Sequence, residues 1–380
     1  MTFPLLIDAL FQPLITLLSG CAVAMIGFGL GRLLTALIGD RNRLSIPLHR
    51  GIEGAATITA VGLWWWEVQM LGQVLLGDND NGAAVAGAAL LIRYAAHLLL
   101  FTLLAAAAWI DIRERVIPDS ITVPGVLVGL LAVWLWPGVL LPIDCEVLRS
   151  FAPPRLQPDL LGLFGGLRSS SGIAWLGGWP WISGLLVSLV IFLTWCLICT
   201  APSFDSHLPR RHFLEPRTII FTGGTLLIIT AWLIDGQRYF ALQSSLVGLA
   251  VSAGVVLAIR AGASWALGRE AMGLGDVTLM AMVGVWLGWQ ACVLAFFLAA
   301  FIGLAHGVWH LLLHREHELP FGPSLCLASA FVVIAWRPIW ARVGFYFEEP
   351  LEMALVVGSV IVLTAVTLSI WQKLRGLPVH

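Results

Sequence analysis

The sequence predicts an all-α protein, a polytopic transmembrane helix bundle of about 11 helices. Of its 380 residues 59% are hydrophobic and only 11% are charged, and the mean hydropathy is +0.92. These values exclude an ordinary soluble domain and a disordered chain. The 18 Trp and 39 Gly residues are typical of a membrane protein, with aromatic side chains at the membrane interfaces and small residues where helices meet.

Apolar stretches long enough to span a bilayer recur along the whole chain, and polar segments separate them. The helices that we expect near residues 276–290 and 291–313 are joined by a very short turn, "GWQAC". The other expected helices lie near residues 12–38, 54–77, 83–110, 120–142, 181–200, 217–234, 239–262, 323–340 and 352–372.

Charge and cysteine usage exclude several classes of function. The formal net charge is −1, so nothing indicates a nucleic-acid partner. The first basic residue is Arg32, so the N-terminus lacks the positive region of a cleaved signal peptide. The six cysteines are scattered, mostly in apolar segments, which favours packing roles over a disulfide framework. Cys196 and Cys199 have the spacing of a zinc or redox pair, but no second pair accompanies them, and we expect no metal and no cofactor.

The basic residues predict the orientation of the chain. If the loop after the first helix is cytoplasmic, that side holds about twice as many Arg and Lys residues as the far side. The N-terminus then lies outside and the C-terminus inside, and the long polar segment 143–180 faces outward. We therefore expect a multi-pass protein of the inner (cytoplasmic) membrane.

Two carboxylates are predicted at the same membrane depth, both reachable from the cytoplasm. Asp111 lies at the cytoplasmic end of a helix in "WIDIRERVIPDSITVPG", where Pro118 prevents the helix from continuing. Asp276 follows Gly273 and Gly275 in "GREAMGLGDVTLM" and begins another helix. Because a charged group near hydrocarbon is costly, each carboxylate is a candidate functional residue.

Two carboxylates in one site suggest acid–base chemistry. Such a pair shares a proton and titrates as a unit, as in aspartic proteases. The neighbouring glycines allow a substrate backbone to approach as an extended strand. Each carboxylate also has a structural alternative, because Asp111 can pair with Arg115 four residues on and Asp276 can be the N-cap of its helix.

The stretches "DIRERVIPDSITVPG", "GREAMGLGDVTLMAMVGVWLGW" and "LPFGPSLCLASA" follow one another in this order along the chain. They resemble the two catalytic motifs and the P-F-G-P segment of the type IV prepilin peptidases, which are membrane aspartyl proteases of the G-x-G-D class. The resemblance implies that Asp111 and Asp276 are the catalytic pair. By the same resemblance, we expect Gly273, Gly275 and Pro118 to form the substrate-binding loops, and Asp119 to be a structural residue near the site.

The resemblance covers residues 83–142 and 239–340, which we expect to form a prepilin-peptidase-like catalytic core. We assign residues 143–238 to an inserted outer loop with two helices. Transmembrane helices flank the core at residues 1–82 and 341–380. The sequence departs from the family at Thr278, where members usually have Lys, and in lacking the paired C-x-x-C motifs of the part linked with N-methylation. We therefore expect an aspartic endopeptidase without methyltransferase activity.

The resemblance implies a substrate class as well. The enzyme would cleave the leader peptide of prepilin or pseudopilin precursors, in type IV pilus assembly or type II secretion, at the cytoplasmic membrane face. Membrane lipid would be its other partner. Two alternatives remain open on the residues alone. The pair of Asp residues can serve a transporter as a cation or proton relay, or the protein can be a catalytically lapsed scaffold of pilus assembly.

Other polar residues in apolar stretches have structural interpretations. Glu67 is expected to make a structural hydrogen bond within the membrane. Arg93 and His97 share one face of a helix, where we expect a buried structural pair. The segment "GFGLGR" at residues 27–32 imitates a nucleotide motif, but close helix packing explains its glycines better.

Cysteine labelling in intact cells tests the predicted topology. In a cysteine-free background, Arg113→Cys and Arg269→Cys should resist a membrane-impermeant maleimide, because both positions are predicted to face the cytoplasm. A cysteine placed within residues 143–180 should react. Equal labelling of residues 111–119 and 143–180 would contradict a shared cytoplasmic site.

Overall fold

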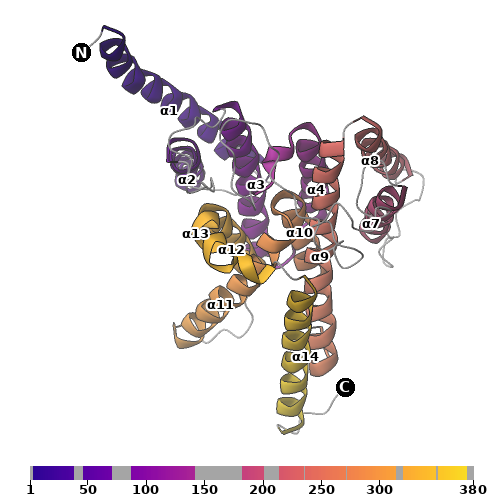
Figure 1. Cartoon of the computed structure of the whole chain (residues 1–380). Coiled ribbons are helices and arrows are strands. Elements are labelled where there is room, and N and C mark those ends of the chain that lie inside the picture. Colours follow the sequence, from indigo (N-terminus) through magenta and orange to yellow (C-terminus); the bar gives the residue numbers. More distant parts are fainter. Residues whose placement is uncertain are drawn as a thin grey trace.

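The computed structural model describes residues 3–37, 46–70, 87–141, 182–200, 214–234, 236–270, 272–313, 320–347 and 350–374. Over these residues the protein is a bundle of α-helices without a strand (Figure 1). The all-α helix bundle predicted from the sequence is confirmed, and the twelve α-helices within the described ranges are close to the expected number. Among them, four are long and apolar enough to cross a membrane, and one bent pair is a fifth candidate.

The helices follow the apolar stretches of the sequence. Residues 143–180, which the topology prediction places on the outer side, lie outside the described residues. In chain order the helices are α1 (Phe3–Leu37), α2 (Ile46–Trp64), α3 (Gly87–Glu114), α4 (Asp119–Leu135), α7 (Ile182–Thr200), α8 (Leu214–Ile234), α9 (Gly236–Leu267), α10 (Leu274–Leu287), α11 (Trp289–Leu313), α12 (Gly322–Ile334), α13 (Trp336–Val343) and α14 (Pro350–Leu374).

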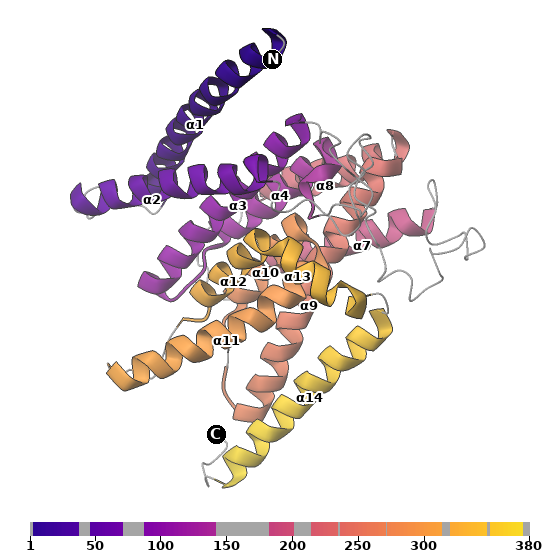
Figure 2. The same cartoon turned by 60° about the vertical axis from the view of Figure 1, so that its left-hand side comes forward.

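Helix α10 is the centre of the bundle. It packs against α4, α9, α11 and α12, and every residue from Leu279 to Leu287 is buried (Figures 1 and 2). A helix that is apolar on all sides is stable only when other helices surround it. The short turn predicted after α10 is also present, because Gly288 alone separates α10 from α11 and adopts a positive φ of 83°.

Glycines allow the neighbours of α10 to approach at backbone distance. Gly248 of α9 faces Gly284 of α10, and a Cβ added to either would collide with the carbonyl oxygen of the other. On the opposite side, Gly125 of α4 lies against Met282, and its carbonyl oxygen accepts a hydrogen bond of 3.0 Å from the indole of Trp286. Small residues at helix contacts are typical of membrane bundles, where packing provides much of the association energy.

The bundle has two ends, and contacts between helices show which helix termini meet at each. Asp119 at the start of α4 lies close enough to Cys199 at the end of α7 for an electrostatic interaction. At the other end of α4, the guanidinium carbon of Arg238 at the start of α9 lies 5.8 Å from the ring centroid of Trp134. Helix α7 therefore finishes at the end of the bundle where α4 begins, and α8 returns the chain to the opposite end, where α9 begins. Helices α3 and α9 both finish at the first of these two ends, where α10 begins.

Helices α7 and α8 lie on the periphery. They pack against each other and against α9, at the right-hand edge of Figure 1, and they do not separate α3 from α10. At the opposite edge, α1 packs on α2 through Gly27 and Gly31. An added Cβ at these glycines would lie 2.9 Å from the Cα of Thr57 and 2.7 Å from the Cα of Glu53, respectively. The interpretation of "GFGLGR" as a helix-packing segment is thus confirmed for Gly27 and Gly31, whereas an added Cβ at Gly29 would meet nothing within 4 Å.

The single helix expected at 323–340 is wrong, because α12 ends at Ile334 and the following segment turns by 84°. Pro338 causes the break, since it has no N–H to donate to the carbonyl of Ile334 four residues earlier. The indole of Trp66 donates to that carbonyl instead, at 2.8 Å. Helix α13 then buries Trp336 and exposes Arg337, as expected for a helix that lies along an interface.

The helix expected at 54–77 also differs, because α2 begins at Ile46 and passes at Trp64 into a π-helical segment, Trp65–Gln69. This segment contains Glu67, whose Oε1 lies 2.7 Å from Nδ1 of His97 on α3, with both side chains buried. Arg93, one turn before His97, donates from Nε to the carbonyl of Gly138 at 2.9 Å. The structural hydrogen bond predicted for Glu67 is confirmed. Arg93 and His97 are both buried, but they bond to Gly138 and Glu67, respectively, instead of forming the expected pair.

The contact between α9 and α10 predicts a specific loss of stability. Gly248→Ala should destabilise the protein by about 1–3 kcal/mol, because the new methyl group collides with backbone that has no rotamer to change. Gly254→Ala is the matched control on the same helix, where an added Cβ meets open space. Thermal unfolding in detergent measures both, and equal midpoints for the two variants would contradict the close approach.

Candidate functional site

Asp111 lies in the last turn of α3 and is only 6% exposed. Its carboxylate accepts a hydrogen bond from the backbone N–H of Gly322, the first residue of α12. A Cβ at Gly322 would collide with the Asp111 carboxylate, so glycine is needed there. The helix stops just beyond, where Arg115 adopts a left-handed φ of 57° and donates its N–H to the Asp111 carbonyl at 2.9 Å. The end of α3 thus directs Asp111 toward α12.

Asp276 lies in the first turn of α10 and is 8% exposed. The N-cap of this helix is Gly273, in an extended conformation, so the suggestion that Asp276 itself is the N-cap is wrong. Asp276 occupies the third helical position, and its carboxylate accepts a hydrogen bond from the Gly273 N–H. This is the reciprocal half of a capping box, in which a side chain of the first turn binds the N-cap backbone.

The two carboxylates meet although they are far apart in the sequence. Asp111 and Asp276 are close enough to interact electrostatically, and the buried thiol of Cys326 on α12 interacts with both. Two like charges in one buried site do not both form easily, so such a pair holds one proton between its members over a range of pH. An ionised and a protonated carboxyl group are then available in one site.

Ile117 packs the three motif segments together. It is 5% exposed and lies between Asp111 and the start of α4. An added Cβ at Gly275 would come within 3.0 Å of Ile117 Cβ, and one at Gly322 within 2.9 Å of Ile117 Cδ1. The sequence analysis did not assign this residue a role. The signal was present, because Ile117 occupies the Ile/Leu position that precedes Pro118 in the first motif.

The remaining predicted site residues occupy the edge of the site. Pro118 is the N-cap of α4, with extended backbone angles, and Asp119 is exposed in the first turn of that helix. Gly273 is exposed in the loop before α10, whereas Gly275 is half-buried under Ile117. Thr278, where the family usually has Lys, donates from its hydroxyl to the carbonyl of Gly275 at 3.0 Å.

Metal ligands do not gather in the described part of the chain. No group of three or more His, Cys, Asp and Glu side chains that could hold a metal ion occurs there. Cys196 and Cys199, the predicted packing residues, lie within α7, where Cys196 is buried and Cys199 is partly buried.

The region around Asp276 matches a known protein family. Residues 210–308 match the model of the type IV leader peptidase family. This match contains Asp276 and the segment with Gly273 and Gly275 before it, called the glycine loop below, whereas Asp111 and Gly322 lie outside it. It also contains α8, which the sequence analysis placed in the insertion. The resemblance inferred from the sequence is confirmed over the matched residues.

Several curated proteins are similar to this chain, and each is named prepilin leader peptidase/N-methyltransferase. The protein of Aeromonas salmonicida strain A449 is 30% identical over 163 residues, which are 42% of this chain and 50% of the relative. The protein of Aeromonas hydrophila is 29% identical over 208 residues, 53% of this chain and 64% of the relative. The protein of Neisseria gonorrhoeae is 28% identical over 209 residues, which are 55% of this chain and 66% of the relative.

This chain thus spans about half the length of the first of these relatives and about two thirds of the third. No solved structure matches it.

Packing at Ile117 is testable without an assay of function. Ile117→Ala should lower the free energy of unfolding by about 2 kcal/mol or more, because it leaves a cavity between segments that collapse only partly. Val116→Ala is the control at the neighbouring position, whose side chain is 61% exposed and should change stability little. Chemical unfolding in detergent measures the difference. Equal effects of the two substitutions would show that Ile117 does not join the motif segments.

Proposed function

We propose that this protein is an aspartic endopeptidase of the prepilin peptidase type. It would cleave the leader peptide of prepilin- or pseudopilin-like precursors at the cytoplasmic face of the inner membrane. The observation that best supports the proposal is the meeting of Asp111 and Asp276 at one end of the helix bundle, beside glycines of two motif segments. The names of the similar proteins supply the reaction and the substrate class.

Peptide hydrolysis needs the groups that such a pair offers. The ionised carboxylate takes a proton from a water molecule as the water oxygen attacks the scissile carbonyl carbon. The protonated carboxyl group donates its proton to the carbonyl oxygen, which gives a neutral tetrahedral intermediate. When the intermediate collapses, the C–N bond breaks, the proton gained from water passes to the leaving nitrogen, and one hydroxyl of the intermediate returns its proton to the other carboxylate as the carbonyl re-forms. The pair then again holds one proton.

The loop before α10 suits an extended substrate. Gly273 and Leu274 are exposed beside Asp276, and Gly273 carries no side chain that would keep a peptide backbone away. A strand laid along this edge would bring its carbonyl carbon toward the carboxylates. Binding in extended form also frees the scissile bond from helical hydrogen bonds, which a protease requires of its substrate.

The proposal is limited to the peptidase reaction. A carboxylate pair supplies a base and an acid for hydrolysis, and neither group transfers a methyl group. The N-methyltransferase in the relatives' name is therefore not carried over to this chain. A transporter is also a weaker interpretation, because Asp111 and Asp276 lie together at helix termini instead of midway along the bundle.

Conservative substitution of the two carboxylates tests the proposal. Asp276→Asn keeps the size of the side chain and an oxygen that accepts the Gly273 N–H, so the protein should fold. Cleavage should nevertheless fall by about 10³-fold or more, because an amide is not a base. Asp111→Asn should behave in the same way, and the double variant should be little worse than either single one, as expected for groups that act as a unit.

The assay is the processing of a pilin-type precursor in membranes, with insertion of each variant checked separately. Asp119→Asn is the control, since Asp119 is exposed outside the carboxylate pair, and it should retain activity. Substantial cleavage by a well-inserted Asp276→Asn protein would reject the catalytic role and leave only the structural role in the first turn of α10.

A further inference from the structure

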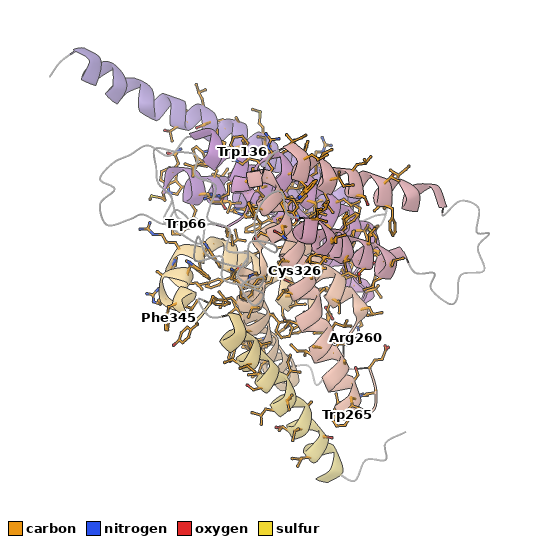
Figure 3. The ribbon with its side chains drawn as sticks, turned by 45° about the vertical axis from the view of Figure 1, so that its right-hand side comes forward. Trp66, Trp136, Arg260, Trp265, Cys326 and Phe345 are labelled. Atoms are coloured by element: carbon orange, nitrogen blue, oxygen red, sulfur yellow. The ribbon has the colours of Figure 1, made fainter. Side chains whose placement is uncertain are left out.

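Arg260 of α9 binds the loop that precedes Asp276. Its Nε donates to the carbonyl oxygen of Met272 at 2.8 Å, and its Nη2 donates to Oε1 of Glu270 at 3.0 Å. Figure 3 shows Arg260 on the lower half of α9, between the level of Cys326 and that of Trp265 near the end of the helix. A single side chain thus attaches the glycine loop to its neighbouring helix at two points.

The contact with Met272 acts on the same peptide group that binds Asp276. The carbonyl of Met272 and the N–H of Gly273 belong to one planar trans peptide, in which they point in opposite directions. Arg260 holds the carbonyl, and the N–H donates to the Asp276 carboxylate. Rotation of this peptide away from Arg260 would therefore also turn the N–H away from the carboxylate.

The two contacts of Arg260 differ in strength. The Arg260 side chain is only 19% exposed, so its hydrogen bond to the backbone carbonyl competes little with water. The carboxylate of Glu270 is 83% exposed, and a surface ion pair of this kind contributes little. The planar guanidinium is suited to hold both acceptors at fixed directions, whereas a lysine ammonium is a point charge on a flexible stem.

We propose that Arg260 is a positioning residue of the carboxylate site. By fixing the Met272–Gly273 peptide, it keeps the Gly273 N–H on Asp276. This inference rests on the proposed peptidase function for its effect on catalysis. The hydrogen-bond relay itself, from Arg260 through the peptide to Asp276, does not depend on that function.

Variants of the full-length protein in membranes test the effect on catalysis. Arg260→Gln should lower kcat for precursor cleavage by about 10- to 100-fold, because a small misplacement of a reacting group has an effect of this size. KM should change by less than about twofold, since the substrate edge remains. Arg260→Lys should restore part of kcat. Arg269→Gln, an exposed arginine of the same loop, and Glu270→Gln are the matched controls and should resemble the parent.

Hydrogen–deuterium exchange gives a readout that is independent of activity. Peptides containing Gly273 should exchange about tenfold faster in Arg260→Gln than in the parent or in Arg269→Gln, because the Gly273 N–H loses its fixed acceptor. Exchange in α4 and α12 should stay unchanged, which shows that the bundle is folded. If all helices of Arg260→Gln exchange rapidly, that variant is not folded. The kcat and the exchange at Gly273 are then compared between Arg260→Lys and the parent instead.

The outcomes separate this inference from the proposed function. Faster exchange at Gly273 together with a lower kcat supports the positioning role. Parent-like exchange at Gly273, or a parent-like kcat in Arg260→Gln, overturns it. If the parent protein cleaves no pilin-type precursor, the proposed function fails, and the exchange data alone then decide whether Arg260 orients the peptide.

Discussion

The backbone contact of α10 with its neighbours is the constraint on which the rest of the structure depends. Gly248 and Gly284 bring α9 and α10 together, and Gly125 brings α4 against Met282 on the other side. A helix held so closely on two sides has a fixed depth and a fixed rotation. The position of Asp276 in its first turn is fixed with it, and so is the direction in which the carboxylate points.

The second carboxylate is placed by the end of α3 and the start of α12. Asp111 accepts the N–H of Gly322, and Ile117 fills the space between Gly322 and Gly275. Each carboxylate therefore binds a backbone N–H of a glycine, while an apolar side chain closes the gap between the segments. Because a Cβ at Gly322 would collide with the Asp111 carboxylate and one at Gly275 would crowd Ile117, these two glycines are as much part of the site as the carboxylates.

Polar contacts attach the N-terminal segment to the rest of the apolar bundle. Pro338 frees the carbonyl of Ile334, and Trp66 binds it. Glu67 from the same π-helical segment pairs with His97 on α3, the helix that also contains Asp111. In an apolar environment such bonds are favoured because each unpaired group would be costly. They connect the N-terminal segment to α12 and α3.

The sequence by itself determined the all-α class, the approximate helices and the two candidate carboxylates, because hydrophobicity, helix length and charge are local properties. Proline marked the end of α3 at Pro118, but the break that Pro338 causes after α12 was missed, and only the structure shows that Trp66 binds the carbonyl freed there. Tertiary structure alone decided that Ile117 joins three segments and that Arg260 holds Met272. Such contacts join residues from separate helices, and their geometry depends on how closely those helices pack, which glycine permits but does not specify.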